Sequence, residues 1–274
     1  TVGIDLVAMN VNDIVCVGAK PISFVDYVGV EEARGPVLEA VGQGLYRGAE
    51  LAGVTICGGE IAQLGEMIKG VEPGAGLDLV GTAIGLVENG GEIIGAELEK
   101  GDTVLGLASS GIHSNGLSLA RKVLLEQASI SLDAHRAELG RTLAEELLEP
   151  TRVYSKQVSD LFAQNAQIKA LVHVTGGGFE NLMRVKKRAS FSIDNLPDPP
   201  PVFKLIQSEG GVSTEEMYRV FNMGVGFCLV CARADADSIK RVLEGHGITA
   251  RRIGQVSETG VSKVVLEEEG VTLR

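Results

Sequence analysis

Three clusters of glycine and small polar residues each follow a short apolar run, and they constrain the fold of this chain most. The clusters are "CGGE" at 57–60, "SSGIHSNG" at 109–116 and "TGGG" at 175–178. Glycine accounts for 36 of the 274 residues, roughly twice the ~7% share of an average protein. Because glycine tolerates positive φ and close backbone approach, these clusters predict sharp turns after strands, at places where a ligand or another backbone comes close.

Two of the clusters repeat one arrangement of strand, turn and helix. The apolar run 103–108 predicts a strand that turns at 109–116, and 168–174 predicts a strand that turns at 175–178. A helix that begins just after such a turn points its free N–H groups into the turn, where they can bind an anion. Neither turn matches the P-loop or the G-x-G-x-x-G pattern, which disfavours a Walker ATPase and a nicotinamide enzyme.

The order of the patterns predicts a two-domain α/β protein. The Gly-rich, acidic stretch 88–102 interrupts the periodic segments, so we predict an N-terminal domain at 1–97 and a sandwich-like C-terminal α/β domain at 98–274. In the first domain we expect helices at 5–19 and 36–52 and strands at 22–30, 54–60 and 78–88. In the second we expect strands at 103–108, 168–174, 189–194 and 224–232 with two more at the end, and helices at 115–127, 137–148, 153–164, 202–210, 213–221 and 235–245.

Charge and aromatic content exclude two classes of partner. The net charge is −11 and aromatic residues make up 4%, which disfavours binding to a nucleic-acid backbone or stacking on its bases. No apolar run approaches the ~20 residues of a membrane span, and no signal peptide is visible. We expect a cytoplasmic protein. Since the chain opens inside a helical pattern without Met, we also expect it to be part of a longer gene product.

His113 stands in the middle of the 109–116 cluster, and three roles are open for it. It can hydrogen-bond the loop backbone, it can contact substrate or transfer a proton, or it can bind a metal. The metal role is disfavoured because no second His or Cys lies at ligand spacing. Ser114 and Asn115 can also cap the following helix, so they have a structural role available as well.

Carboxylates in the first domain are candidates for binding a nucleotide with its metal. Asn12 and Asp13 lie in the first helix, where the spacing places Asp13 on the apolar face, so this carboxylate needs a cation as partner. Glu60 follows two glycines at the predicted end of a strand. Such hard oxygen ligands suit Mg²⁺ bound with nucleotide phosphates. A salt bridge for Asp13 and a solvated turn position for Glu60 remain the structural alternatives.

Several longer stretches, in order along nearly the whole chain, carry a family resemblance. They are "GIDLVAMNVNDIVCVGAKPISFVDY", "CGGE", "SSGIHSNGLSLARKVL", "EPTRVY", "HVTGGGFENLMRV" and "EEMYRVFNMGVGF". In combination they resemble phosphoribosylformylglycinamidine cyclo-ligase, also called aminoimidazole ribonucleotide synthetase, of purine biosynthesis. Paralogues such as thiamine-monophosphate kinase and selenophosphate synthetase share the fold, but "HSNG" together with "MYRVFNMGVG" favours the cyclo-ligase.

The resemblance implies ATP-dependent ring closure of formylglycinamidine ribonucleotide to aminoimidazole ribonucleotide, ADP and phosphate. It implies that Asn12, Asp13 and Glu60 serve ATP and Mg²⁺, with Asp13 and Glu60 as the metal ligands. His113 becomes the candidate for proton transfer or oxyanion contact. The implied substrate-binding residues are Ser109, Ser110, Gly111, Ser114, Asn115, Gly116, Thr175, Gly176, Gly177 and Gly178.

The resemblance also implies a homodimer in which two N-terminal domains join their strands into a β-barrel flanked by helices. The family has a further N-terminal segment, with a glycine-rich loop and an Asp-Gly-Val-Gly-Thr-Lys stretch that contributes to the nucleotide site. This sequence lacks that stretch. Two alternatives to the cyclo-ligase follow: a kinase-like paralogue, and a fragment that binds nucleotide without catalysis.

Overall fold

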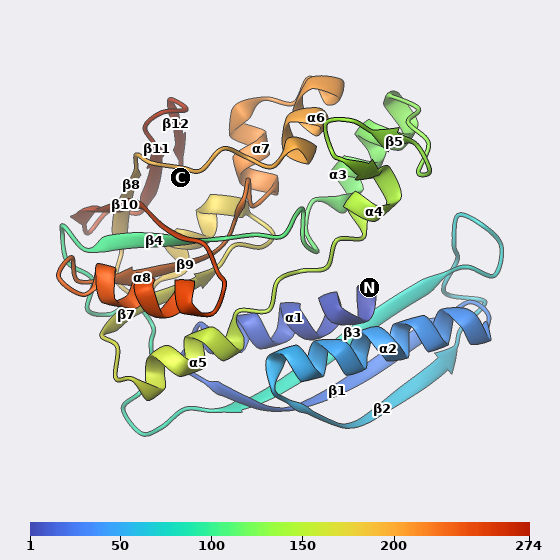
Figure 1. The fold of residues 1–274 in the computed structure, drawn as a ribbon, viewed down its shortest axis with the longest axis horizontal. Coiled ribbons are helices and arrows are strands. Elements are labelled where there is room, and N and C mark those ends of the chain that lie inside the picture. The colour runs from blue at the N-terminus through green and yellow to red at the C-terminus, as the bar shows by residue number, and fades with distance from the viewer. The chain divides into compact units, whose positions relative to one another are not determined.

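The computed structural model describes all residues, 1–274, which divide into two units. Unit 1 comprises Thr1–Glu92 and Val153–Lys156, and unit 2 comprises Ile93–Arg152 and Gln157–Arg274. Each unit is built of helices packed on a sheet of its own (Figure 1). The two-domain α/β class predicted from the sequence is therefore confirmed, and both sheets are open rather than closed into a barrel.

Unit 1 is a three-stranded sheet with two helices on one face (Figure 1). The central strand pairs in parallel with one neighbour and antiparallel with the other, in the order β2-β1-β3. Its elements are α1 (Val2–Val15), β1 (Lys20–Val30), α2 (Gly35–Ala52), β2 (Thr55–Gln63) and β3 (Leu77–Leu86).

Glycines allow the two helices of unit 1 to approach closely. A Cβ on Gly3 of α1 would lie 2.4 Å from the carbonyl oxygen of Val41 in α2, and a Cβ on Gly48 of α2 would lie 2.9 Å from the Cβ of Val7 in α1. Because no side chain separates the helix backbones there, Val7 and Val11 pack into a continuous core with Phe24 of β1. The helical glycines of this segment therefore serve packing.

The other face of this sheet is open. Along β3 the exposed residues alternate with half-buried ones, as expected of a strand covered on one face. The exposed apolar side chains on this face include Ile22, Val80, Ile84 and Leu86, which are 42–64% exposed. Exposed apolar side chains that gather on one face of a sheet are typical of an interaction surface.

Unit 2 contains a seven-stranded mixed sheet in the order β12-β11-β8-β10-β4-β9-β7. The strands are β4 (Thr103–Ala108), β7 (Ile168–His173), β8 (Ala189–Ile193), β9 (Val225–Cys231), β10 (Ala250–Thr259), β11 (Lys263–Leu266) and β12 (Val271–Leu273), and β5 (His135–Arg136) with β6 (Arg141–Thr142) forms a separate hairpin. The helices are α3 (Leu117–Arg121), a π-helix (Lys122–Gln127), α4 (Leu143–Leu147), α5 (Ser155–Ala163), a 3₁₀-helix (Gly178–Arg184), α6 (Pro201–Gly210), α7 (Thr214–Val220) and α8 (Ala236–Gly245).

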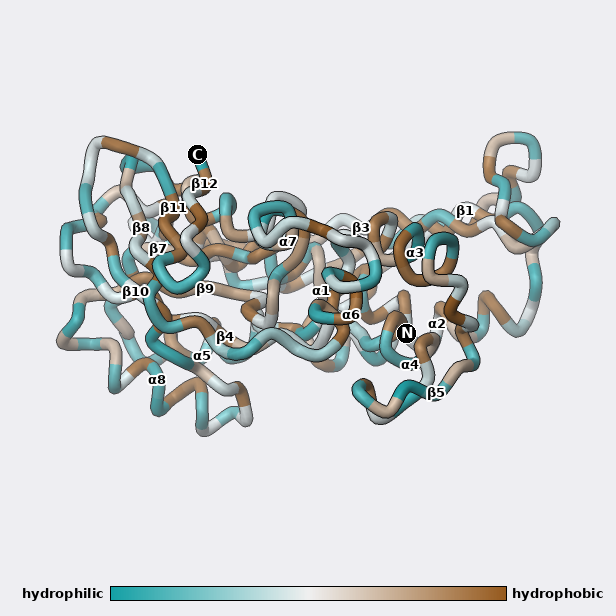
Figure 2. The backbone as a smooth tube through the Cα atoms, turned by 90° about the horizontal axis from the view of Figure 1, so that it is seen from above, coloured by the Kyte–Doolittle hydropathy of each residue, from teal (hydrophilic) through white to brown (hydrophobic).

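Both faces of the large sheet are covered at β9, which explains why this strand is apolar throughout. Every residue of β9 is buried. Its Cys228 and Val230 belong to the main core, in which α6, α7 and the 3₁₀-helix also take part. On β10 and β4 lies the amphipathic α8, along which hydrophilic and hydrophobic residues alternate (Figure 2). A strand buried on both faces needs no polar alternation.

Three local features differ from what the sequence suggested. The helix expected at 137–148 is a hairpin followed by the short α4, because Gly140 turns with φ +69°. The helix begins only after Thr142, which forms a capping box with Glu145. Helix α3 is preceded by Gly116 at φ +83° and has no side-chain cap, so neither Ser114 nor Asn115 caps it. Three strands, not two, follow α8.

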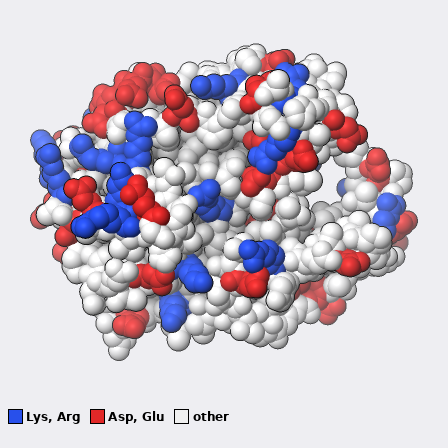
Figure 3. All heavy atoms as spheres, in the orientation of Figure 1, with Lys and Arg blue, Asp and Glu red and all other residues white.

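No helix is long and apolar enough to span a membrane. On the face drawn in Figure 3, acidic side chains lie interspersed with basic ones. This mixture agrees with a chain whose 36 carboxylates outnumber its 25 Lys and Arg residues.

Candidate functional site

The two glycine loops of unit 2 meet at one edge of the large sheet. Strands β4 and β7 are both antiparallel to β9, which lies between them, so their carboxyl ends reach the same edge. The loop 109–116 follows β4 and the loop 175–178 follows β7. A Cβ on Gly176 would lie 3.3 Å from Oδ1 of Asn115. The structure therefore brings together the two turns that the sequence predicted separately, at the strand ends where α/β proteins commonly bind ligands.

His113 lies inside the first loop rather than on its surface. It is 5% exposed and has φ +64°. Its Nε2 accepts from the backbone N–H of Ser110 at 3.1 Å and from that of Arg152 at 3.5 Å. Because Nε2 is the acceptor, the neutral ring carries its proton on Nδ1. The backbone-bonding role is therefore present in the structure.

Burial makes this imidazole a neutral group. Desolvation first, and then the charges of His173 and Arg152, lower the pKa of His113 to about 3. The reason is that an apolar surrounding disfavours the charged form. At neutral pH the side chain can accept or donate hydrogen bonds, but it supplies no positive charge to an anionic substrate.

The motif "EPTRVY" carried the family resemblance but no predicted site residue, and its first part contacts this loop. Two serine hydroxyl groups of the loop form hydrogen bonds to residues 149–152, "EPTR". The Oγ of Ser110 donates to the carbonyl of Pro150 at 2.6 Å, and the Oγ of Ser114 lies 2.8 Å from Oγ1 of Thr151. Together with the bond from Arg152 to His113, these contacts tie the loop to the 149–152 segment.

The second loop is held by a buried asparagine. Asn181, 1% exposed, accepts through Oδ1 from the backbone N–H of Thr175 at 2.8 Å and donates through Nδ2 to the carbonyl of Gly176 at 3.1 Å. Arg184 donates to the same carbonyl at 3.2 Å. The 3₁₀-helix that follows the loop therefore fixes the loop's own backbone.

Gly178 in this loop occupies a position that no other residue fits. Its φ is +53°, and a Cβ placed on it would lie 2.0 Å from the carbonyl oxygen of Tyr218. Both the conformation and the space therefore require glycine. The glycine run at 175–178 serves close backbone packing at its last position.

Several N–H groups of the predicted anion cradle already have partners within the chain. The N–H of Ser109 donates to the carbonyl of Gly224 at 3.0 Å, and that of Ser110 to His113. In the other loop, Thr175 donates to Asn181 and Gly178 to the carbonyl of Thr175. These four N–H groups are therefore used within the chain and are not free to bind an anion.

In unit 1, the Asn12–Asp13 pair is arranged differently from the prediction. The apolar face of α1 contains Asn12, which is fully buried and accepts through Oδ1 from the N–H of Tyr154 at 2.8 Å. Asp13 is exposed, so its predicted place on the apolar face was wrong. Asn12, one residue earlier in the helix, faces the 153–156 segment instead.

Glu60 and Asp13 lie on different sides of the small sheet. "CGGE" lies within β2, which continues to Gln63, and not at a strand end. In the β1–β2 register Glu60 is opposite Tyr27, on the open face, whereas α1 covers the other face. No group of three or more His, Cys, Asp or Glu side chains is arranged to hold a metal ion. The register thus separates the two predicted metal ligands, and their binding of Mg²⁺ stays a prediction.

A carboxylate that the sequence reasoning did not consider lies on the covered face. Asp26 of β1 is half-buried, and a Cβ on the neighbouring Gly59 would lie 2.6 Å from its Oδ1. Burial raises the pKa of Asp26. Gly59, the second glycine of "CGGE", thus makes room for the carboxylate of Asp26. The pairing of β1 with β2 places these two residues opposite each other, which no local sequence pattern indicates.

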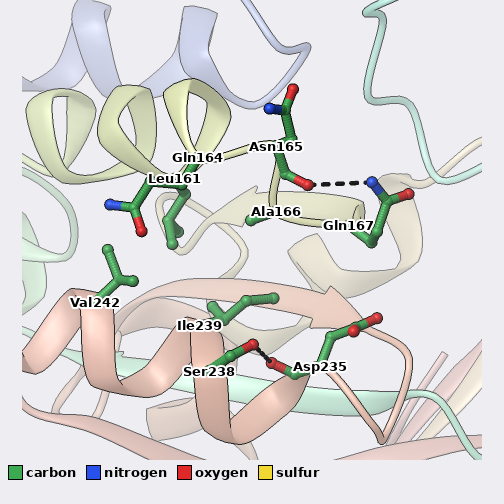
Figure 4. A pocket seen from close by; sticks show the side chains of 9 residues that line it. All are labelled: Leu161, Gln164, Asn165, Ala166, Gln167, Asp235, Ser238, Ile239 and Val242. Atoms are coloured by element: carbon green, nitrogen blue, oxygen red, sulfur yellow. Dashed lines mark hydrogen bonds between the residues drawn. The ribbon is translucent and has the colours of Figure 1, made fainter.

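A shallow pocket lies in unit 2 at the other ends of β7 and β9, away from the two glycine loops. It is formed where β7 begins and β9 ends, between the turn 164–167 and α8, with the amides of Asn165 and Gln167 on one side and Asp235 and Ser238 on the other (Figure 4). None of the predicted site residues lines it. It is therefore separate from the loop site.

The fold and the paired loops place the chain in a known class, the AIR synthase related proteins. Residues 1–87 match the N-terminal domain of this class and residues 99–267 its C-terminal domain. Phosphoribosylformylglycinamidine cyclo-ligase of Methanococcus vannielii is 45% identical over 94% of this chain and 72% of its own length. That of Methanothermobacter thermautotrophicus is 46% identical over 97% and 76%. The chain belongs to the phosphoribosylformylglycinamidine cyclo-ligase family, as its motifs predicted.

Solved structures of more distant proteins share the fold. The hydrogenase maturation protein HypE superimposes with a TM-score of 0.70 at 21% identity, over 99% of this chain and 81% of its own. Thiamine-monophosphate kinase from Stenotrophomonas maltophilia gives a TM-score of 0.69 at 20% identity, over 98% and 80%. These likenesses support the two-domain architecture.

Proposed function

We propose that the chain catalyses the ATP-dependent ring closure of formylglycinamidine ribonucleotide to aminoimidazole ribonucleotide, ADP and phosphate, in purine biosynthesis. The observation that carries this proposal is the 45% identity, over 94% of the chain, to relatives that bear this activity in their name. For such a metabolic enzyme the cytoplasmic location expected from the sequence stays a prediction.

The chemistry explains why ATP is needed. The γ-phosphoryl group moves from ATP to the formyl amide oxygen, breaking its bond to ADP. The nitrogen that closes the ring then attacks the activated carbon, and the former amide oxygen leaves with the phosphoryl group as phosphate. Catalysis of such a transfer consists mostly of positioning and of stabilising the charge that develops.

We assign the ribonucleotide substrate to the edge where the loops 109–116 and 175–178 meet. Glycine backbone at Gly176 and the amide of Asn115 lie side by side there, which suits a phosphate or an amide oxygen. His113 is the titratable side chain of the first loop. Since it is neutral at pH 7, its part is hydrogen bonding to the loop or to the reacting groups.

We assign ATP to unit 1. The exposed carboxylate of Asp13 lies there, on helix α1 and so on the covered side of the sheet. Mg²⁺ usually binds through one or two carboxylates together with substrate phosphates and keeps several waters. The strand register does not favour a joint Asp13–Glu60 site, so Asp13 alone would contribute a carboxylate to an ion held mainly by the ATP phosphates.

A direct assay tests this function. The protein as encoded by its gene is incubated with formylglycinamidine ribonucleotide, ATP and Mg²⁺, and ADP, phosphate and the imidazole product are measured. We expect all three in equal amounts. Phosphorylated substrate without phosphate release would indicate a kinase-like paralogue instead, and no ADP above the substrate-free control would rule out the proposed reaction.

Asp13→Asn extends the test to the nucleotide site. We expect turnover to fall about 100-fold, the scale observed when one charge-stabilising group is removed, while the melting temperature stays near that of the parent. Asp237→Asn is the matched control, because Asp237 is also an exposed aspartate on a helix. Equal turnover in both variants would remove Asp13 from the site.

We further propose that the open face of the unit 1 sheet is covered by the same face of a second copy, giving the shared barrel expected from the family. Its support is the exposed apolar side chains of Ile22, Val80, Ile84 and Leu86. An edge strand with an apolar face otherwise invites aggregation.

Ile84→Lys tests the dimer. We expect a shift from dimer to monomer in light scattering coupled to size-exclusion chromatography, because a lysine ammonium would be buried unpaired in the interface. Val37→Lys is the control, since Val37 is 44% exposed on helix α2, away from this face. A dimer that persists in Ile84→Lys would contradict the proposed interface.

A further inference from the structure

We propose that Asn222 is a positioning residue for the ring closure, because its side chain fixes the backbone of the loop that presents His113. The proposal rests on the function proposed above and deepens it. Asn222 is 3% exposed and lies in the turn immediately before β9, between the two glycine loops of the candidate site.

The amide of Asn222 clamps the loop at two consecutive carbonyls. Its Nδ2 donates to the carbonyl oxygens of Gly111 and Ile112, each at 2.9 Å. These are the two residues directly before His113. Since an amide carries two N–H bonds, both donors are used, and both buried carbonyls gain a partner.

The backbone of the turn 222–224 is also hydrogen-bonded to the loop. The Oδ1 of Asn222 accepts from the N–H of Gly224 at 2.9 Å, and the carbonyl of Gly224 accepts from the N–H of Ser109 at 3.0 Å. The turn requires positive φ at Met223 and at Gly224, +49° and +96°. The side chain thus holds both a strained turn and the loop with a single group.

This clamp determines where His113 can be. The residue has a left-handed backbone, which costs energy for any side chain other than glycine, so it persists only if the flanking backbone is held. On one side it is held by Asn222 through Gly111 and Ile112, and on the other by Thr151 through Ser114. Without the Asn222 donors, the loop can relax and expose the imidazole.

A second buried asparagine, Asn181, holds the other glycine loop in a similar way. Asn181 both donates to and accepts from the loop 175–178, as Asn222 does for the loop 109–113 and the turn before β9. Each loop of the sheet edge is therefore held by one buried asparagine that lies outside it. Neither residue belongs to a glycine cluster.

Asn222→Asp is the sharpest variant, because it keeps the shape and Oδ1 but replaces the two donors by a carboxylate oxygen facing two carbonyls. In the protein as encoded by its gene, we expect kcat/KM for formylglycinamidine ribonucleotide to fall at least 10-fold. KM for ATP is expected to stay within 3-fold. Asn222→Ser, which removes the donors without adding charge, should show the same split if the aspartate variant does not fold.

Asn195→Asp is the matched control. Its Nδ2 also donates to one backbone carbonyl, that of Arg252, at 2.7 Å, but it lies at the start of the 195–200 loop. We expect its kinetic constants to remain within 2-fold of the parent. Equal losses in the Asn222 and Asn195 variants, or a folded Asn222 variant with kcat/KM within 2-fold of the parent, would overturn the proposal.

A second measurement does not depend on the reaction. The Cε1–H resonance of His113 is followed by NMR between pH 4 and pH 8 in parent and variant. We expect titration in this range only in the folded Asn222 variant, because the loosened loop admits water. If the parent shows no ring closure, the proposed function fails alone, and an unchanged His113 titration would then overturn the positioning role separately.

Discussion

Gly178→Ala is expected to lower the free energy of unfolding of unit 2 by about 2–5 kcal/mol. A left-handed backbone costs a residue with a Cβ roughly 1–2 kcal/mol, and overpacking a filled site costs about 1–3 kcal/mol. Both apply, because φ is +53° and the new Cβ would lie 2.0 Å from the carbonyl oxygen of Tyr218. Urea unfolding monitored by circular dichroism measures the loss, and turnover is expected to fall with it.

Gly211→Ala separates the two causes. Gly211 ends α6 at φ +59° and a Cβ there would meet nothing within 4 Å, so only the backbone term of roughly 1–2 kcal/mol applies. We expect this variant to remain active. If both alanine variants lost the same stability, the close contact with Tyr218 would contribute nothing, contrary to the structure.

The second large effect is a loss of stability in mild acid that depends on His113. The pKa of this group is about 3 in the folded chain and 6.5 in its ordinary state. Between these values the unfolded chain binds one proton more than the folded chain, so stability falls as the pH is lowered. The slope reaches about 1.4 kcal/mol per pH unit, and the loss from pH 7 to pH 5 is about 2 kcal/mol.

His113→Gln tests this assignment, because the Gln side chain offers an oxygen near the Nε2 position but does not titrate. We expect the difference in unfolding free energy between pH 7 and pH 5 to shrink by about 2 kcal/mol. His135→Gln is the control, since His135 is exposed in the β5–β6 hairpin. An unchanged pH dependence in His113→Gln would show that this imidazole is already charged in the folded protein.

The periodic elements were predictable because their signals are local. Helices such as α2 and α8 and buried strands such as β4 and β9 follow from apolar spacing alone, within a few residues at their ends. The hairpin at 135–142 was missed, since Gly140 interrupts a helical pattern whose apolar spacing continues through Leu139, Leu143 and Leu147. A single residue with positive φ outweighed three residues that favoured a helix.

The site was predictable only in its parts. The loops 109–116 and 175–178 were identified by their glycines, and the family by the motifs that contain them. The placement of Asp13 on an apolar face was wrong by one position, because helical spacing cannot distinguish a buried amide from its exposed neighbour. Glu60 was expected at a strand end, but β2 continues past it, since extended pairing with β1 persists beyond the glycines.

The sequence by itself determined the family, the two-domain α/β class and the two glycine loops, because these depend on residue types and short-range spacing. Only the tertiary structure decided that the loops meet, through two strands that are both antiparallel to β9. It also decided that Asn222 and Asn181 hold them and that His113 is neutral. Such properties arise from hydrogen bonds and burial between residues as much as 111 positions apart, which no local pattern records.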